Sequence, residues 1–216
     1  PEAEAFRAEV RAFLAEHLPV GWRGLGALDR DEAEEFSNRW RRTLAEHRMI
    51  GITWPVEHGG RGLGKIHQVV LAQEFAKAGV PIYRVADTTS IKMLGNTLLA
   101  WGTPEQQAKY MPGIVSGDAT WVQGYSEPEA GSDLAGLKLR AVRHGDEWVL
   151  NGQKIWTSRG MDGTAVFTLA RTDPDAPKHR GISFILCELP NPGIEVRPIR
   201  TLTGDDEFCE IFYTDA

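Results

Sequence analysis

Two short stretches of this 216-residue chain combine hydrogen-bonding side chains with glycines at spacings that suit ligand binding. The first stretch, residues 121–133, begins as a strand, because Trp121 and Val122 are bulky residues that favour extended backbone. It ends in a loop that contains Pro128 and Gly131, both of which favour tight turns. A strand that ends in such a loop presents backbone N–H groups at fixed positions, which a flat ligand with a polar edge requires. The alternative interpretation is a polar surface turn between two strands.

The second stretch, residues 148–160, contains a tryptophan followed by two hydroxyl side chains. Asn151-Gly152 lies between apolar runs and predicts a two-residue hairpin turn. The strand after this turn would carry Trp156, Thr157 and Ser158. An indole face followed by hydroxyl groups could contact an aromatic ligand by stacking and hydrogen bonding. The alternative is a core tryptophan with hydroxyl residues that finish a strand.

Together, the two stretches resemble the acyl-CoA dehydrogenase family of flavoproteins. The matching residues are Tyr125-Ser126-Glu127-Pro128 with Ala130-Gly131-Ser132-Asp133, and Asn151-Gly152-Gln153-Lys154 with Trp156-Thr157-Ser158. The spacing between these two blocks is also similar to that of the family. A shorter match lies in residues 51–62, with Trp54-Pro55 and Glu57-His58-Gly59-Gly60. The resemblance extends over essentially the whole chain.

The resemblance implies that the chain binds FAD and an acyl-CoA substrate. The implied FAD contacts are Gln123, Tyr125, Ser126, Gly131, Ser132, Trp156, Thr157 and Ser158, and Ser132 is also the implied contact to acyl-CoA. Backbone N–H groups near Ser126 would stabilise the negative charge that builds on the reduced flavin. Trp156 would lie between flavin and solvent, a placement that suits an electron-transfer flavoprotein as electron acceptor. Gln123 departs from the family pattern, because many relatives carry an aromatic residue there.

The implied reaction removes a proton next to the thioester carbonyl and a hydride from the next carbon, and it needs a positioned base. In the family this base is a glutamate of the C-terminal domain, and no residue of this sequence matches it. Glu127, Glu129 and Asp133 lie close to the flavin motif, but we expect structural roles for them, with Asp133 bonding backbone N–H groups in its turn. We therefore assign no catalytic residue here. For the isolated piece we expect no turnover and weak FAD binding.

Three kinds of protein are compatible with these residues. The first is an acyl-CoA dehydrogenase present here without its catalytic-base domain. The second is a non-catalytic partner subunit that binds flavin or acyl-CoA. The third is a flavin oxidase or monooxygenase of the same fold. The chain has no Gly-x-Gly-x-x-Gly motif between a strand and a helix, so a Rossmann-type cofactor site is not predicted.

Composition excludes several other functions. The net charge of −6 argues against nucleic-acid binding, which usually requires a basic face. No run of about eighteen apolar residues predicts a membrane span, and no signal peptide opens the chain, so we expect a cytoplasmic protein. Cys187 and Cys209 lie in apolar runs and are predicted to be free buried thiols. His58 has no second ligand at a useful spacing, and we predict no metal site.

Periodicity predicts an α+β protein with two domains: an all-α N-terminal helical domain over residues 1–117 and a β-barrel-like middle domain over residues 118–216. The predicted helices span 2–18, 30–48, 65–79, 82–101 and 104–115, with a loop at 50–64. The predicted strands span 119–125, 137–143, 146–150, 153–157, 164–171, 181–188, 194–199 and 208–214. The resemblance implies the same layout and adds a C-terminal four-helix bundle. We expect that bundle to be absent from this chain, and it would be the part through which homo- or hetero-oligomers form.

Overall fold

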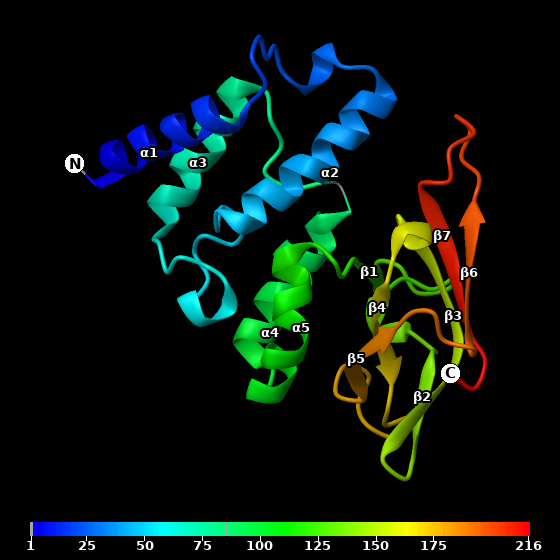
Figure 1. The fold of residues 1–216 in the computed structure, drawn as a ribbon. Coiled ribbons are helices and arrows are strands. Elements are labelled where there is room, and N and C mark those ends of the chain that lie inside the picture. Colours follow the sequence, from blue (N-terminus) through cyan, green and yellow to red (C-terminus); the bar gives the residue numbers. More distant parts are fainter. Residues whose placement is uncertain (1, 85) are drawn as a thin grey trace. The chain divides into compact units, whose positions relative to one another are not determined.

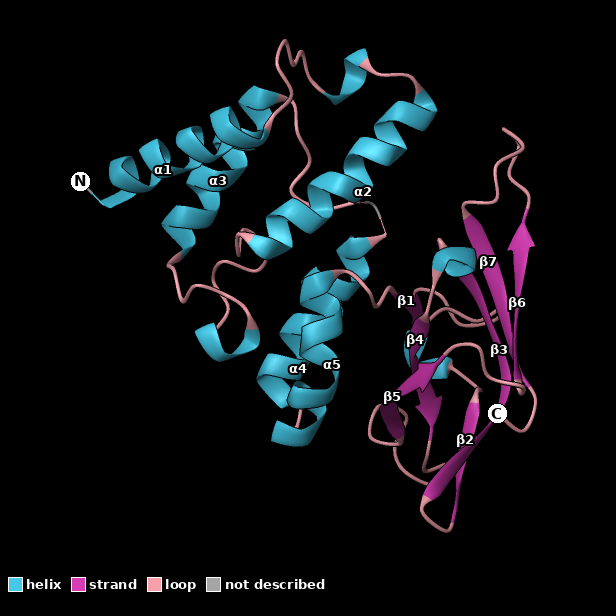
Figure 2. Cartoon of the chain, in the orientation of Figure 1, coloured by secondary structure: helices cyan, strands magenta, loops and turns pink. Residues whose placement is uncertain are grey.

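The structure is a computed structural model that describes residues 2–84 and 86–216. The chain divides into two compact units, one ending at Asp118 and the other beginning at Ala119. All long helices belong to the first unit and all strands to the second (Figures 1 and 2). The predicted fold class, a helical region followed by a curled sheet, is confirmed.

The helical unit contains most of the helices that the sequence predicts. They are α1 (Glu2–His17), α2 (Arg30–Glu46), α3 (Lys65–Ala78), a π-helix (Thr89–Gly95), α4 (Asn96–Trp101) and α5 (Pro104–Ser116). Local hydrogen bonds explain where α2 and α5 begin, because Asp29 and Thr103 each form a capping box with the residue three positions later. The apolar faces of α1, α2 and α3 meet in an aromatic core, in which Phe13 lies 5.6 Å from Trp40 and 6.5 Å from Phe75 between ring centroids.

The predicted helix over 82–101 is wrong in its first part. Residues 82–84 are not helical, Val85 lies outside the described residues, and the segment continues as the π-helix Thr89–Gly95 before α4. A local contact competes with the helix, because the carboxylate of Asp87 accepts hydrogen bonds from the backbone N–H and the guanidinium of Arg84.

The loop over residues 50–64, which the sequence predicts, surrounds a buried tryptophan. Trp54 is buried, and its indole N–H donates to the side-chain oxygen of Asn96 at 2.9 Å. Glycine is required where the backbone approaches this residue. A Cβ at Gly60 would overlap the carbonyl oxygen of Trp54, and a Cβ at Gly95 would lie 2.5 Å from its ring.

The second unit is a seven-stranded mixed sheet. Its strands are β1 (Trp121–Gly124), β2 (Arg140–His144), β3 (Glu147–Ser158), β4 (Ala165–Arg171), β5 (Ile182–Glu188), β6 (Ile194–Ile199) and β7 (Phe208–Tyr213). The order is β1-β4-β2-β3-β7-β6, and β5 pairs with β4. β1 and β4 run parallel, as do β4 and β2 at one residue pair, whereas the other pairs are antiparallel. The sheet encloses a core that includes Leu139, Leu150, Val166 and Ile211.

The predicted hairpin turn at Asn151-Gly152 is wrong, because both residues lie inside the long strand β3. β3 pairs with β2 as far as Asn151 and with β7 from Gly152 onward, so it changes partner at this point. The amide of Asn151 binds Asp215 through two hydrogen bonds of 2.9 and 3.1 Å. Gly152 has a φ of 145°, and a Cβ there would lie 3.0 Å from Leu139. The dipeptide thus marks the change of partner within one strand.

Both cysteines are free thiols, as predicted, although Cys187 is only partly buried, whereas Cys209 is fully buried. Burial raises the pKa of the Cys187 thiol to about 11. No helix among the described residues is both long and apolar enough to cross a membrane.

Candidate functional site

Hydrogen bonds bring the two stretches, residues 121–133 and 148–160, together. The hydroxyl of Thr157 donates to the backbone oxygen of Gln123 at 3.0 Å, and the ammonium of Lys154 donates to that of Tyr125 at 3.0 Å. The backbone N–H of Ile155 donates to the oxygen of Ser126 at 2.9 Å. The segment that leaves β1 therefore runs beside the second half of β3, although about thirty residues separate them in sequence.

At the end of β1, the side chains of Gln123 and Tyr125 are half-buried, and Tyr125 packs against Phe167. The ring of Tyr125 meets Phe167 edge-on, with centroids 5.8 Å apart and an interplanar angle of 80°. Burial raises the pKa of the Tyr125 phenol, and a hydrogen bond with the Gln123 side chain opposes that change. The phenol therefore stays protonated, and Gln123 and Tyr125 offer both donors and acceptors.

Trp156 has an unusual backbone conformation. Its φ is 63°, in the left-handed region that bulky residues avoid, and Arg159 is also left-handed with a φ of 56°. The register between β3 and β7 shifts between Lys154 and Thr157, so Trp156 lies in a bulge. Its indole is 58 % exposed and meets Phe208 edge-on. Strained residues of this kind are concentrated at ligand sites.

The three carboxylates near the first stretch are all engaged by cations. Glu127 is buried and accepts a hydrogen bond from the ammonium of Lys154 at 2.8 Å, while Glu129 pairs with Lys138. Asp133, which we expected to bind backbone N–H groups, pairs instead with the ammonium of Lys178 at 2.5 Å. Glu127 therefore has a structural role, whereas the ion pairs of Glu129 and Asp133 lie on the surface.

Gly131 and Ser132 are exposed on the loop between β1 and β2 and take no part in these hydrogen bonds. A hollow of about 240 Å³ lies near the base of this loop. Its lining residues are Glu127, Pro128, Glu129, Lys138, Leu139, Gly152 and Gln153, so none of the residues predicted to contact FAD lines it.

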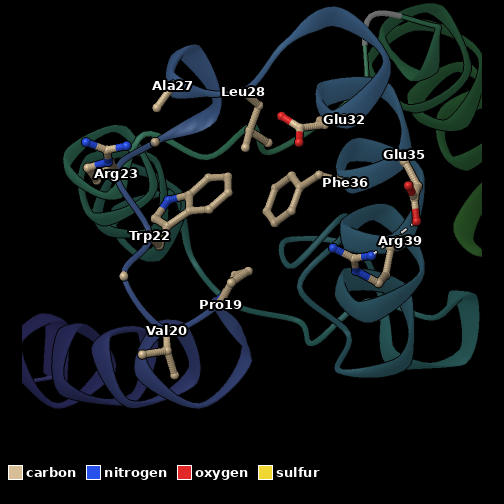
Figure 3. A pocket seen from close by; sticks show the side chains of 12 residues that line it. Pro19, Val20, Trp22, Arg23, Ala27, Leu28, Glu32, Glu35, Phe36 and Arg39 are labelled. Carbon is tan, nitrogen blue, oxygen red and sulfur yellow. Dashed lines mark ion pairs between the residues drawn. The ribbon is translucent and has the colours of Figure 1, made fainter.

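The helical unit has two larger hollows that the sequence did not indicate. One, of about 420 Å³, is lined mainly by α5 and by the turn that contains His58. The other, of about 350 Å³, lies between the chain after α1 and the start of α2 (Figure 3). Trp22 and Phe36 stack beside it with centroids 4.3 Å apart. Neither hollow contains a residue of the two stretches.

No group of three or more His, Cys, Asp or Glu side chains in the described part of the chain is arranged to hold a metal ion. The donor set at the junction of β1 and β3 instead suits a flat organic ring. It combines half-exposed hydroxyl and amide groups with one exposed indole. Sequence reasoning missed two features of this junction: the left-handed Trp156 and the buried Lys154, which was part of a matched motif but had no assigned role.

The chain is thus a helical unit followed by a curled mixed sheet. Residues 1–118 match the family described as Acyl-CoA dehydrogenase, N-terminal domain, and residues 123–216 match Acyl-CoA dehydrogenase, middle domain. The chain therefore belongs to the acyl-CoA dehydrogenase family, and the resemblance seen in the sequence is confirmed.

Individual relatives are similar over the whole chain. Acyl-CoA dehydrogenase IpdE1 of Mycobacterium tuberculosis is 43 % identical over 219 residues, which include 100 % of this chain and 56 % of that protein. Two solved structures, of the Tcur3481-Tcur3483 steroid ACAD and of the ChsE4-ChsE5 complex from Mycobacterium tuberculosis, each have a TM-score of 0.77. They are 37 % and 34 % identical, and the alignment covers 100 % of this chain and 54 % of each matched chain. The chain thus spans little more than half the length of these relatives.

Proposed function

We propose that the complete protein is an FAD-dependent acyl-CoA dehydrogenase, and that this chain supplies part of its cofactor and substrate site. The observation that carries the proposal is the set of hydrogen bonds between residues 123–126 and 154–157, because it joins the two stretches for which the motif resemblance implies flavin binding. Bound FAD would accept the hydride that leaves the acyl chain.

The residues present fit such a cofactor. Gln123, Tyr125 and Ser126 would offer hydrogen bonds to the polar edge of the ring, together with the backbone N–H groups beside them. Ser158 would extend this polar edge from β3, and Trp156 would cover the ring with its exposed indole. Thr157, predicted to contact FAD, is buried, and its hydroxyl would instead hold the Gln123 backbone in place. The predicted contacts Gly131 and Ser132 lie on an open loop, where a Cβ added at Gly131 meets no atom within 4 Å. Ser132 is proposed to contact the acyl-CoA there.

The proton acceptor is proposed to lie outside this chain. A base must reach the substrate with a free carboxylate, whereas Glu127 is buried against Lys154 and Asp133 is paired with Lys178. The isolated chain should therefore show no dehydrogenase turnover.

The relatives also support a proposal about substrate and assembly. Both similar structures are named for pairs of proteins, and one of the two is named a steroid ACAD. We therefore favour a bulky, polycyclic acyl-CoA as substrate and a second chain of the same family as partner in a hetero-oligomer. An electron-transfer flavoprotein is the proposed electron acceptor, and the cytoplasm is the proposed location.

The test is an anaerobic titration of the complete natural protein, produced alone and together with its candidate partner chain. We expect a yellow protein whose visible flavin absorption is bleached by a bulky acyl-CoA and less by a short straight-chain one. Slow reoxidation by air would separate a dehydrogenase from an oxidase. A protein that binds no FAD in either form would contradict the proposal.

A further inference from the structure

The side chain of Glu127 closes the loop that carries Gly131 and Ser132. At one end of the loop, the backbones of Glu127 and Ala130 exchange hydrogen bonds of 2.9 and 3.1 Å, which forms a tight turn. At the other end, the carboxylate of Glu127 accepts the backbone N–H of Lys138 at 2.6 Å and that of Leu139 at 2.8 Å. The loop therefore begins and ends on one buried residue.

Lys154 connects this closed loop to the other parts of the site. Its ammonium donates to Glu127 Oε1 at 2.8 Å and to the backbone oxygen of Tyr125 at 3.0 Å. Lys154 is fully buried on β3, two residues before Trp156 and at the start of the bulge. The Lys154 ammonium thus contacts Glu127, which closes the loop, and Tyr125, which follows β1. The backbone of Lys154 continues directly into the segment that carries Trp156.

Stability alone gives little reason to bury such a pair. Removing two charges from water costs several kcal/mol per ion, and well-packed apolar residues of similar volume are often as stable or more so. Burial accordingly lowers the pKa of the Lys154 ammonium, while the hydrogen bond to Glu127 opposes that change. What an apolar pair could not replace is directional contact with the Tyr125 oxygen and with the two N–H groups at the end of the loop.

We propose that Glu127 and Lys154 are positioning residues that together set the relative placement of both ligand-binding stretches. The inference rests on the proposed function for the identity of the ligand. Neither residue would touch FAD or substrate through its charge, because both are buried and engaged by protein groups. Their effect on the ligand would pass through Tyr125, Ser126, the loop with Ser132 and the segment with Trp156.

The first test needs no ligand. Hydrogen–deuterium exchange is compared in the wild type, in Lys154→Met, in Glu127→Gln and in the double variant. The proposal expects each single variant to speed exchange in residues 128–138 and 153–158 together, because one pair anchors both. Faster exchange in only one of the two segments, in both single variants, would contradict it.

The second test measures FAD affinity and thermal stability in the complete natural protein. The control is Asp87→Asn, which disturbs a buried ion pair of the helical unit. In the double variant no buried charge is left without a partner, so stability should recover relative to the single variants. FAD affinity of the double variant should stay about tenfold below that of the wild type, because the backbone oxygen of Tyr125 has lost the Lys154 ammonium as its donor. Asp87→Asn should change FAD affinity much less than it changes stability.

The outcomes separate the two proposals. If the wild type binds no FAD, the proposed function fails. If the wild type binds FAD and the double variant recovers affinity together with stability, Glu127 and Lys154 are merely structural and the inference is overturned. If all Glu127 and Lys154 variants fail to fold while Asp87→Asn still folds, the pair is required for folding itself. That result would also overturn the inference.

Discussion

Each unit of the protein contains a buried ion pair, and the two pairs hold different kinds of structure. In the helical unit, Arg41 and Asp87 are 2 % and 1 % exposed, and Arg41 also donates to the backbone oxygens of Ile114 and Val115 at 2.8 Å each. These oxygens belong to the last turn of α5, where helices lack internal partners. In the β unit, Lys154 and Glu127 are 0 % and 7 % exposed and bind loop segments.

In both units a buried cation donates to backbone oxygens, at a helix end in one unit and in the proposed ligand site in the other. Arg41 satisfies carbonyl groups of a regular helix, so its loss should affect the stability of that helix and its packing. Lys154 satisfies a carbonyl group in an irregular segment between two elements of the proposed site. Its loss should therefore affect both stability and ligand binding. Four experiments compare the two units, and they follow in order from the largest expected effect to the smallest.

The largest effects should come from removing one cation of each pair. Lys154→Met leaves the buried carboxylate of Glu127 without its cation, which typically costs about 3–5 kcal/mol. Arg41→Met leaves Asp87 paired with Arg84 but removes two donors from the end of α5, so its loss should be no larger than that of Lys154→Met. Urea unfolding measures both losses, and hydrogen exchange assigns each loss to its unit. Only Lys154→Met should also weaken FAD binding. Equal weakening by Arg41→Met would remove the distinction between the two pairs.

A pair of glycine substitutions should have a smaller effect. Gly60→Ala places a methyl group against the carbonyl oxygen of Trp54, and the resulting overpacking should cost about 1–3 kcal/mol. Gly131→Ala places its methyl group in open space, so stability should change by less than about 0.5 kcal/mol. Thermal unfolding of both variants checks this, and a Gly131→Ala loss as large as that of Gly60→Ala would show that the site loop is more tightly packed than the structure indicates.

Acid should weaken the helical unit through Glu74. Hydrogen bonds from Arg11, Lys77 and Arg7 lower the pKa of Glu74 from 4.5 to about 2. Because the folded-state pKa is the lower one, the stabilisation is complete above about 4.5 and is lost as the pH falls toward about 2. Unfolding of the wild type across this window should show the loss, and Glu74→Gln should show a flatter pH dependence. Identical pH dependence of the two proteins would exclude Glu74 as the cause.

The smallest change concerns left-handed residues. Arg48 follows the last turn of α2 with a φ of 52°, a position where glycine is favoured, so Arg48→Gly should stabilise the helical unit by about 1 kcal/mol. Trp156→Gly should remove similar strain from the β unit but weaken FAD binding. Denaturant midpoints and FAD titrations of the two variants are the measurements. Unchanged FAD affinity in Trp156→Gly would show that the Trp156 indole has no role in the site.

Much of this architecture could be predicted because local signals and tertiary structure agree. The predicted helices over 30–48 and 104–115 correspond to α2 and α5, and capping boxes at Asp29 and Thr103 begin them. The Asn151-Gly152 signal failed because pairing with β2 on one side and β7 on the other outweighs local turn preference. The helix start near residue 82 failed because Asp87 binds Arg84 instead.

The sequence names the residues of the proposed site but not their arrangement. The matched motifs contain Tyr125, Ser126 and Thr157, and the structure joins their two stretches by hydrogen bonds. Nothing in the local sequence marks Trp156 as left-handed, because the bulge depends on the register with β7. The burial of Lys154 was equally hidden, since lysine is ordinarily a surface residue.

The most direct test of the central claim, that β1 and β3 together form one side of an FAD site, is the quenching of tryptophan emission by FAD in the complete protein. Trp156 and Trp148 are two exposed tryptophans on the same strand, 58 % and 42 % exposed. With flavin binding followed separately by flavin fluorescence, Trp156→Phe should abolish most of the quenching and Trp148→Phe should preserve it. Quenching that persists in Trp156→Phe and disappears in Trp148→Phe, or no FAD binding at all, would contradict the account.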